Sequence, residues 1–189
     1  MKQSKTLLLF AFLIGLFPNA ALALDIFQKY TKLSQLSTNF SQVKELKGLG
    51  VKLKSQGDMQ FKKPDFFQWK VTSPKSFSFI FRGDSIELLE NDKVVKSADA
   101  TTFDPKMLNA ISHLKAWLTI DQKFIEANYA IKQLSKNLYE FIPLGKNKIF
   151  KSIQVETGEK YPIKRISLTE LSDDSIDIEF TQTKLTYEN

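Results

Sequence analysis

The stretch from Gly57 to Pro74 constrains the fold of this chain more than any other part of it. Apolar and polar residues alternate on both sides of a Lys-Lys-Pro-Asp interruption, which predicts two strands joined by a short turn. Proline breaks the alternation because it fixes φ and cannot donate a ladder hydrogen bond. Each strand therefore has one dry face, and something apolar must cover the large side chains that share it: Met59, Phe61, Phe67, Trp69 and Val71.

Alternating runs separated by turn residues continue through most of the remaining chain. After Pro74, three phenylalanines fall on one face of a predicted strand: Phe77, Phe79 and Phe81. Further strands are expected at 38–47, 51–61, 86–89, 94–95, 124–133, 138–144, 148–156, 163–171 and 176–186. The connections between them are short, so neighbouring strands should pair antiparallel in a meander.

Two segments have helical spacing instead. An amphipathic helix is predicted over 25–36 from the apolar residues Ile26, Phe27, Tyr30, Leu33 and Leu36. A central helix is predicted to begin at Asp104-Pro105, because an acid caps a helix and proline suits its first turn. Its apolar stripe is Met107, Leu108, Ile111, Leu114 and Leu118. About eleven strands and two or three helices predict a mainly β, α+β domain, in which one curved antiparallel sheet forms a half-barrel with helices across its open side.

The N-terminus has the pattern of an export signal. A basic start at 1–5 precedes an apolar run at 6–18 and the small-x-small triplet Ala21-Leu22-Ala23. We therefore expect a cleavable secretory signal peptide over 1–23 and one domain over 24–189. An uncleaved N-terminal anchor is the alternative.

Charge and cysteine content exclude several classes of function. The chain has no cysteine, which removes disulfides, thiol catalysis and thiolate metal sites. Its net charge is +6, or +4 once Lys2 and Lys5 are removed with the signal peptide. The lysines are dispersed, which favours a solvated basic surface over attraction to anionic lipid or an acidic partner. Without a basic cluster, binding to nucleic acid is not expected.

Residues that could carry catalysis are few. His113 is the single histidine and lies among apolar residues of the central helix, so a partly exposed helix position is favoured over a metal ligand or a base. The acidic pairs Asp173-Asp174 and Asp177 with Glu179 fit a turn and a solvated strand face. No nucleophile elbow, P-loop or dinucleotide fingerprint is present. We therefore expect a protein that is not an enzyme and has no catalytic residue, cofactor or metal.

The chain is instead rich in apolar side chains that must be buried. It contains 16 Phe, the aromatic residue that has no polar group, against 2 Trp and 5 Tyr. An ordinary half-barrel core accounts for many of them. A concave sheet closed by amphipathic helices also leaves room for a cavity that holds an acyl chain, and burial is worth about 0.8 kcal/mol per methylene.

A family resemblance supports the second interpretation. The hairpin pattern resembles the LolA family, the periplasmic carriers of outer-membrane lipoproteins, through Gly57, Met59, Phe61, Lys63, Pro64, Phe67, Trp69 and Pro74. The preceding segment is also similar, through Ser37, Phe40 and Gln42. The resemblance implies a periplasmic, monomeric carrier that holds the acyl groups of lipoproteins in a half-barrel cavity under a helical lid. It implies three partners: acylated lipoprotein cargo, an inner-membrane ABC release complex and a LolB-like outer-membrane receptor.

The resemblance also suggests roles for single residues. Lys63 matches a basic residue, usually arginine, that latches the lid; lysine lacks the planar fork of arginine, so the latch should be weaker or different. Phe67 matches a phenylalanine at the cavity rim. The expected lipid-binding residues are Phe67, Trp69, Phe61, Met59, Phe77, Phe79, Phe81 and Leu114. An exposed turn for Lys63 and plain strand packing for Phe67 remain open.

Two alternative functions also remain open. One is a LolA-like carrier of another lipid, such as a glycolipid or a polyketide-type lipid. The other is a non-carrier module that senses envelope stress or scaffolds a complex.

Overall fold

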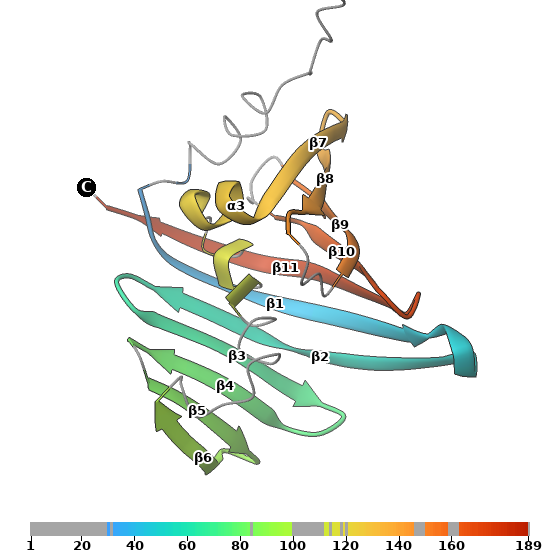
Figure 1. Ribbon diagram of the computed structural model, residues 1–189. Helices are drawn as coiled ribbons and strands as arrows, with labels where there is room; N and C mark the ends of the chain where they lie inside the picture. The colour runs from blue at the N-terminus through green and yellow to red at the C-terminus, as the bar shows by residue number, and fades with distance from the viewer. Residues whose placement is uncertain are drawn as a thin grey trace, which may run out of the picture.

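The sheet accounts for most of the described chain. The structure, a computed structural model, describes residues 30, 32–83, 85–99, 112–113, 115–117, 119, 121–145, 150–158 and 163–188. These residues contain eleven strands in one antiparallel sheet, in the order β6-β5-β4-β3-β2-β1-β11-β10-β9-β8-β7. The sheet curves rather than lying flat (Figure 1). The predicted class, a mainly β fold built on a single antiparallel sheet with few helices, is confirmed.

Most strand bounds lie close to the predicted runs, but β1 and β6 are longer than predicted and β7 starts later. The first half of the chain forms β1 (Leu33–Leu46), β2 (Val51–Lys62), β3 (Phe66–Ser73), β4 (Phe77–Arg82), β5 (Ser85–Glu90) and β6 (Lys93–Asp99). The second half forms β7 (Tyr129–Ser135), β8 (Leu138–Pro143), β9 (Phe150–Glu156), β10 (Arg165–Glu170) and β11 (Ser175–Tyr187). A 3-10 turn, η1 (Lys47–Leu49), connects β1 to β2, and Gly50 closes it with a left-handed φ of 64°.

The long strands β1, β2 and β11 form the middle of the sheet. The first described strand, β1, pairs with β2 on one side and with the last strand, β11, on the other. Each half of the chain then runs outward as a meander, to β6 at one edge and to β7 at the other. The short predicted connections therefore produce the antiparallel neighbours that were expected.

The predicted helix over 25–36 is wrong in its last turn. Leu33 and Leu36 lie in β1, while the segment 25–29 lies outside the described residues. The pairing of β1 with β11 shifts register between Leu33 and Gln35, so β1 has one extra residue there. That irregularity turns Leu33 and Leu36, three residues apart, toward the same core, and both are buried. A bulged strand has thus produced the spacing of a helix.

The predicted strand starting at 124 is also wrong at its beginning. Residues Gln122–Asn128 form a helix, α3, and the strand starts only at Tyr129. Asp121 caps α3, because its side chain accepts a hydrogen bond of 3.0 Å from the backbone N–H of Phe124. Residues 112–113 and 115–117 are helical, as predicted for the central helix, whose expected start at Asp104-Pro105 lies outside the described residues.

The helical residues and α3 stand on one side of the sheet (Figure 1). Ile125 of α3 and Trp117 are almost completely buried there, in the same apolar core as the inward side chains of the strands. Among the described residues, no helix is long and apolar enough to cross a membrane.

Candidate functional site

The strands β1 to β4 form the first half of an aromatic wall on the covered face of the sheet. Their register aligns inward side chains in rows that cross all four strands. One row is Leu36, Phe61, Phe67 and Phe81; the next is Thr38, Met59, Trp69 and Phe79; the third is Phe40, Gly57, Val71 and Phe77. Seven of the eight predicted lipid-binding residues thus share one surface, and the eighth, Leu114, lies outside the described residues.

The wall is not buried evenly. Met59 and Phe67 are fully buried, and Phe61, Trp69 and Phe81 are nearly so. Phe77 and Phe79 are only half-buried and pack against the edge of the core. The rings meet at the geometries that aromatic pairs favour, such as the edge-on contact of Phe67 with Phe81 at 6.0 Å between centroids. The half-buried phenylalanines leave apolar surface on the wall within reach of a ligand.

Gly57 shapes the middle of the wall. A Cβ atom built on this residue would lie 2.8 Å from Cζ of Phe40 and 1.9 Å from the carbonyl oxygen of Lys70. The missing side chain lets the Phe40 ring lie over the backbone, where it stacks on Trp69 with centroids 3.9 Å apart. Glycine is therefore required here for close packing rather than for a turn.

The second half of the wall comes from β7 to β11, and none of its residues was predicted to bind lipid. These strands contribute buried apolar side chains that belong to the same core cluster: Tyr129, Tyr139, Phe141, Phe150, Ile153, Val155, Ile166, Leu168, Ile178 and Phe180. Their alternation was visible in the sequence and predicted strands. Alternation alone does not distinguish a cavity wall from an ordinary core, so the sequence contained no pattern that marks these residues as part of a site.

Helical residues cover this second half through a cluster of rings. His113 packs edge-on against Phe124 and Tyr129, with centroids 4.9 and 5.4 Å away. Its Nδ1 atom also hydrogen-bonds to the hydroxyl of Tyr129. Trp117 packs against both Tyr129 and Phe141, whose rings also contact each other. Burial lowers the pKa of His113 and raises the pKa of Tyr129, so both side chains are neutral near pH 7.

An open cleft lies where the helical residues meet the β2–β3 hairpin. Its volume is about 790 Å³. Phe61 and Tyr30 supply apolar lining, and three lysines stand around it: Lys63, Lys115 and Lys123. The ammonium group of Lys115 also lies 5.8 Å from the ring centroid of Phe81. Two carboxylates, Asp121 and Glu126, also line the cleft, so its charged groups are mixed in sign with lysines in excess. Its full lining is Tyr30, Phe61, Lys63, Pro64, Lys115, Thr119, Asp121, Gln122, Lys123 and Glu126.

Lys63 stands at the corner of this cleft. Its backbone N–H donates to the carbonyl of Ser34 at 2.8 Å, which fixes the hairpin against β1. Its ammonium group lies 3.2 Å from a carboxylate oxygen of Glu188, just beyond β11. The backbone N–H of Glu188 in turn donates to the carbonyl of Lys32 at 2.8 Å. The side chain of the predicted latch thus joins the β2–β3 hairpin to the residue that follows β11.

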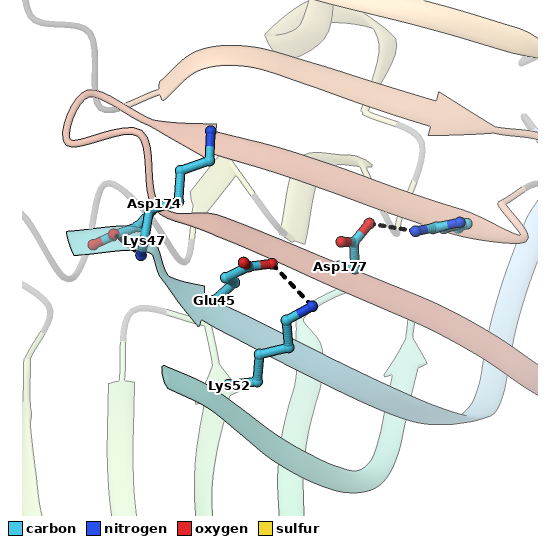
Figure 2. Close-up of polar contacts among 6 residues, drawn as sticks. Glu45, Lys47, Lys52, Asp174 and Asp177 are labelled. Atoms are coloured by element: carbon cyan, nitrogen blue, oxygen red, sulfur yellow. Dashed lines mark hydrogen bonds and ion pairs between the residues drawn. The ribbon is translucent and has the colours of Figure 1, made fainter. Parts of the chain in front are cut away.

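The predicted acidic residues lie elsewhere, and Asp173, Asp174 and Asp177 are engaged in structural contacts. Asp177 accepts hydrogen bonds of 2.6 Å from Arg165 and from Ser167, and Figure 2 shows the first of these beside the ion pair of Glu45 with Lys52. Partial burial raises the pKa of Asp177, but these hydrogen bonds outweigh it and lower the pKa overall. Across the described part of the chain, no three His, Asp or Glu side chains are placed to hold a metal ion.

Comparison with known proteins agrees with this arrangement. The model of the family described as "Outer membrane lipoprotein carrier protein LolA" matches residues 31–188. The chain belongs to the LolA family. The match includes both halves of the wall and the Lys63 hairpin, so the resemblance noted in the sequence is confirmed over most of the chain.

Individual LolA relatives are distant. An outer-membrane lipoprotein carrier protein of Proteus mirabilis is 25% identical over 150 residues, which cover 77% of this chain and 69% of that protein. One from Francisella philomiragia is 24% identical over 167 residues, or 85% of this chain and 76% of that protein. The crystal structure of a LolA superfamily protein from Nitrosomonas europaea is similar with a TM-score of 0.46 and 9% identity, covering 88% of this chain and 94% of that one.

Proposed function

We propose that this protein is a periplasmic carrier that ferries lipoproteins from the inner to the outer membrane by burying their acyl chains. The observation that carries the proposal is the aromatic wall beside an open cleft of about 790 Å³. Transfer of a hydrocarbon chain from water to such a surface is favourable by about 0.8 kcal/mol per methylene and needs no specific contact. Membership of a family described as lipoprotein carriers supports lipoproteins as the cargo.

The proposal includes an itinerary. Residues 1–23 direct export and are removed, and the domain over 24–189 then acts in the periplasm. It receives cargo from an inner-membrane ABC release complex and delivers it to a LolB-like receptor in the outer membrane. The relatives from Proteus and Francisella, which are named outer-membrane lipoprotein carrier proteins, support outer-membrane lipoproteins as the cargo of this route. On this proposal the protein binds and releases cargo without changing it chemically.

Native mass spectrometry tests the cargo directly. The mature protein should be purified from the periplasm of its source without detergent and should show a fraction with an acylated lipoprotein bound. A different lipid adduct would replace this proposal with a carrier of another lipid. An empty monomer that also fails to take up a fluorescent fatty acid would reject the carrier function and favour an interaction module.

Lys63 offers a test of the release step. If this side chain latches the cleft, Lys63→Leu should accumulate bound cargo or lose transfer when lipoproteins pass from inner-membrane to outer-membrane vesicles. Lys62→Leu is the matched control, because the neighbouring lysine is exposed and lines a different, smaller pocket of the sheet. Equal transfer by the two variants would remove the latch role and leave Lys63 as a hairpin residue.

A further inference from the structure

The core contains one polar atom that the fold does not explain. Trp117 is only 2% exposed, and its indole nitrogen, Nε1, is buried. No described residue offers Nε1 a hydrogen-bond acceptor, and it is the one buried side-chain nitrogen or oxygen in the described structure with this deficit. A buried N–H without a partner costs free energy, and phenylalanine would fill much of the same space without that cost. The donor therefore needs an explanation.

The surroundings of the indole are rings whose polar atoms are already engaged. The Trp117 ring lies 5.4 Å from the ring of Tyr129 and 6.5 Å from that of Phe141, measured between centroids. The Tyr129 hydroxyl is hydrogen-bonded to Nδ1 of His113, one turn before Trp117 on the same helical segment. The Nε1 donor of Trp117 thus lies without a partner among aromatic rings.

We propose that the N–H of Trp117 donates a hydrogen bond to a carbonyl oxygen of the bound cargo, at the ester or amide that links an acyl chain to the rest of the cargo. This inference rests on the proposed carrier function. The carbonyl oxygen of an ester accepts hydrogen bonds and donates none, and an indole N–H only donates, so the two are complementary. Lys115 and Thr119, two residues before and two residues after Trp117 in the sequence, line the cleft.

The test compares two probes in two proteins. Displacement of a fluorescent fatty acid measures the affinity of the mature protein for a fatty-acid methyl ester and for an alkane with the same number of heavy atoms. In Trp117→Phe, the ratio of ester affinity to alkane affinity should fall about fivefold, because one net hydrogen bond is lost. Trp69→Phe is the matched control: it can weaken both probes, since Trp69 lies in the wall, but it should leave their ratio unchanged.

A second readout keeps Trp117 in place. The chain has 2 Trp, so in Trp69→Phe all indole emission comes from Trp117. The ester should shift this emission to longer wavelength, because donating a hydrogen bond from the indole N–H lowers the emission energy of the indole, and the alkane should not. An unchanged affinity ratio together with equal emission for both probes overturns the proposal and leaves water as the partner of Nε1. If the wild type binds neither probe, the carrier function fails as well, which is a distinguishable result.

Discussion

Replacing Gly57 with alanine should destabilise the fold strongly, because the wall has no room for a methyl group there. The new Cβ would lie 1.9 Å from the carbonyl oxygen of Lys70 and 2.8 Å from Cζ of Phe40. Relief requires a shift of the β2–β3 ladder and a displacement of Phe40 from its stack on Trp69. Overpacking costs about 1–3 kcal/mol, and loss of an aromatic pair about 0.5–1.5 kcal/mol. Each of these costs matches or exceeds the stabilisation of about 0.4–1 kcal/mol that alanine provides by reducing the conformational entropy of the unfolded chain.

We therefore expect Gly57→Ala to lower the free energy of unfolding by about 2–3 kcal/mol, and Tm by about 5–12 °C. The assay is urea unfolding of the mature protein followed by tryptophan fluorescence. Gly48→Ala is the control, since a Cβ on Gly48 meets no atom within 4 Å, and its effect should stay within about 0.5 kcal/mol. Unfolding of both variants at the same urea concentration would refute the close-packing argument for Gly57.

Three other predictions concern single side chains. Burial lowers the pKa of His113 from 6.5, so near this pH the unfolded chain binds more protons than the folded one. The free energy of unfolding should therefore fall as the pH drops below about 6.5. Urea titrations of His113→Phe should lack this pH dependence. Hydrogen bonds from Ser167 and Arg165 lower the pKa of Asp177 below 3.8, so its contribution is present above that pH and lost in stronger acid. Asp177→Asn should cost about 0.5–1 kcal/mol at pH 7 and flatten the acid limb of a pH–stability curve. Phe67→Glu should reduce binding of a fluorescent fatty acid, and an equally tight probe would place Phe67 outside the binding surface.

The strands were predictable because their signal is local. A period of two residues is independent of the partner strand, and the side chains of Phe67 and Trp69 had to share a face whatever they packed against. The same reasoning brought Phe77, Phe79 and Phe81 onto one surface, which the register confirms. Short turns then left antiparallel pairing as the simple solution. The sheet and one half of the wall could therefore be predicted from spacing alone.

The errors occurred where tertiary structure alters the local period. The bulge near Ser34 depends on pairing with β11, far away in the sequence, so it could not be seen from the apolar spacing of Leu33 and Leu36. At α3 the helix is only seven residues long, too short for its period to stand out from a strand. Asp121 was nevertheless a usable signal for the start of α3. An acidic residue is typical just before a helix, where its side chain accepts from a backbone N–H of the first turn.

The site itself is less predictable than the sheet, because it depends on contacts between distant segments. The unpaired nitrogen of Trp117 can be recognised only after β7 and β8 have enclosed it. The cleft likewise combines the hairpin, the helical residues and Asp121 from separate parts of the chain. Resemblance to a family indicated Lys63, whereas its contact with Glu188 follows from the adjacency of β1 and β11.

The aromatic wall is held by many contacts, whereas the Lys63 side of the cleft is held by a weak one. That difference suits a carrier. The wall is held by stacked rings and eleven paired strands, so its shape is costly to change. The side-chain contact of Lys63 with Glu188 is an exposed ion pair, with 37% and 54% of the two side chains accessible, and pairs of this kind contribute only about 0–1 kcal/mol. A carrier that both takes up and releases acyl chains needs an opening step that is small compared with the free energy of acyl burial. On the proposed function, motion is therefore expected at the corner of the cleft, while the aromatic wall keeps its shape.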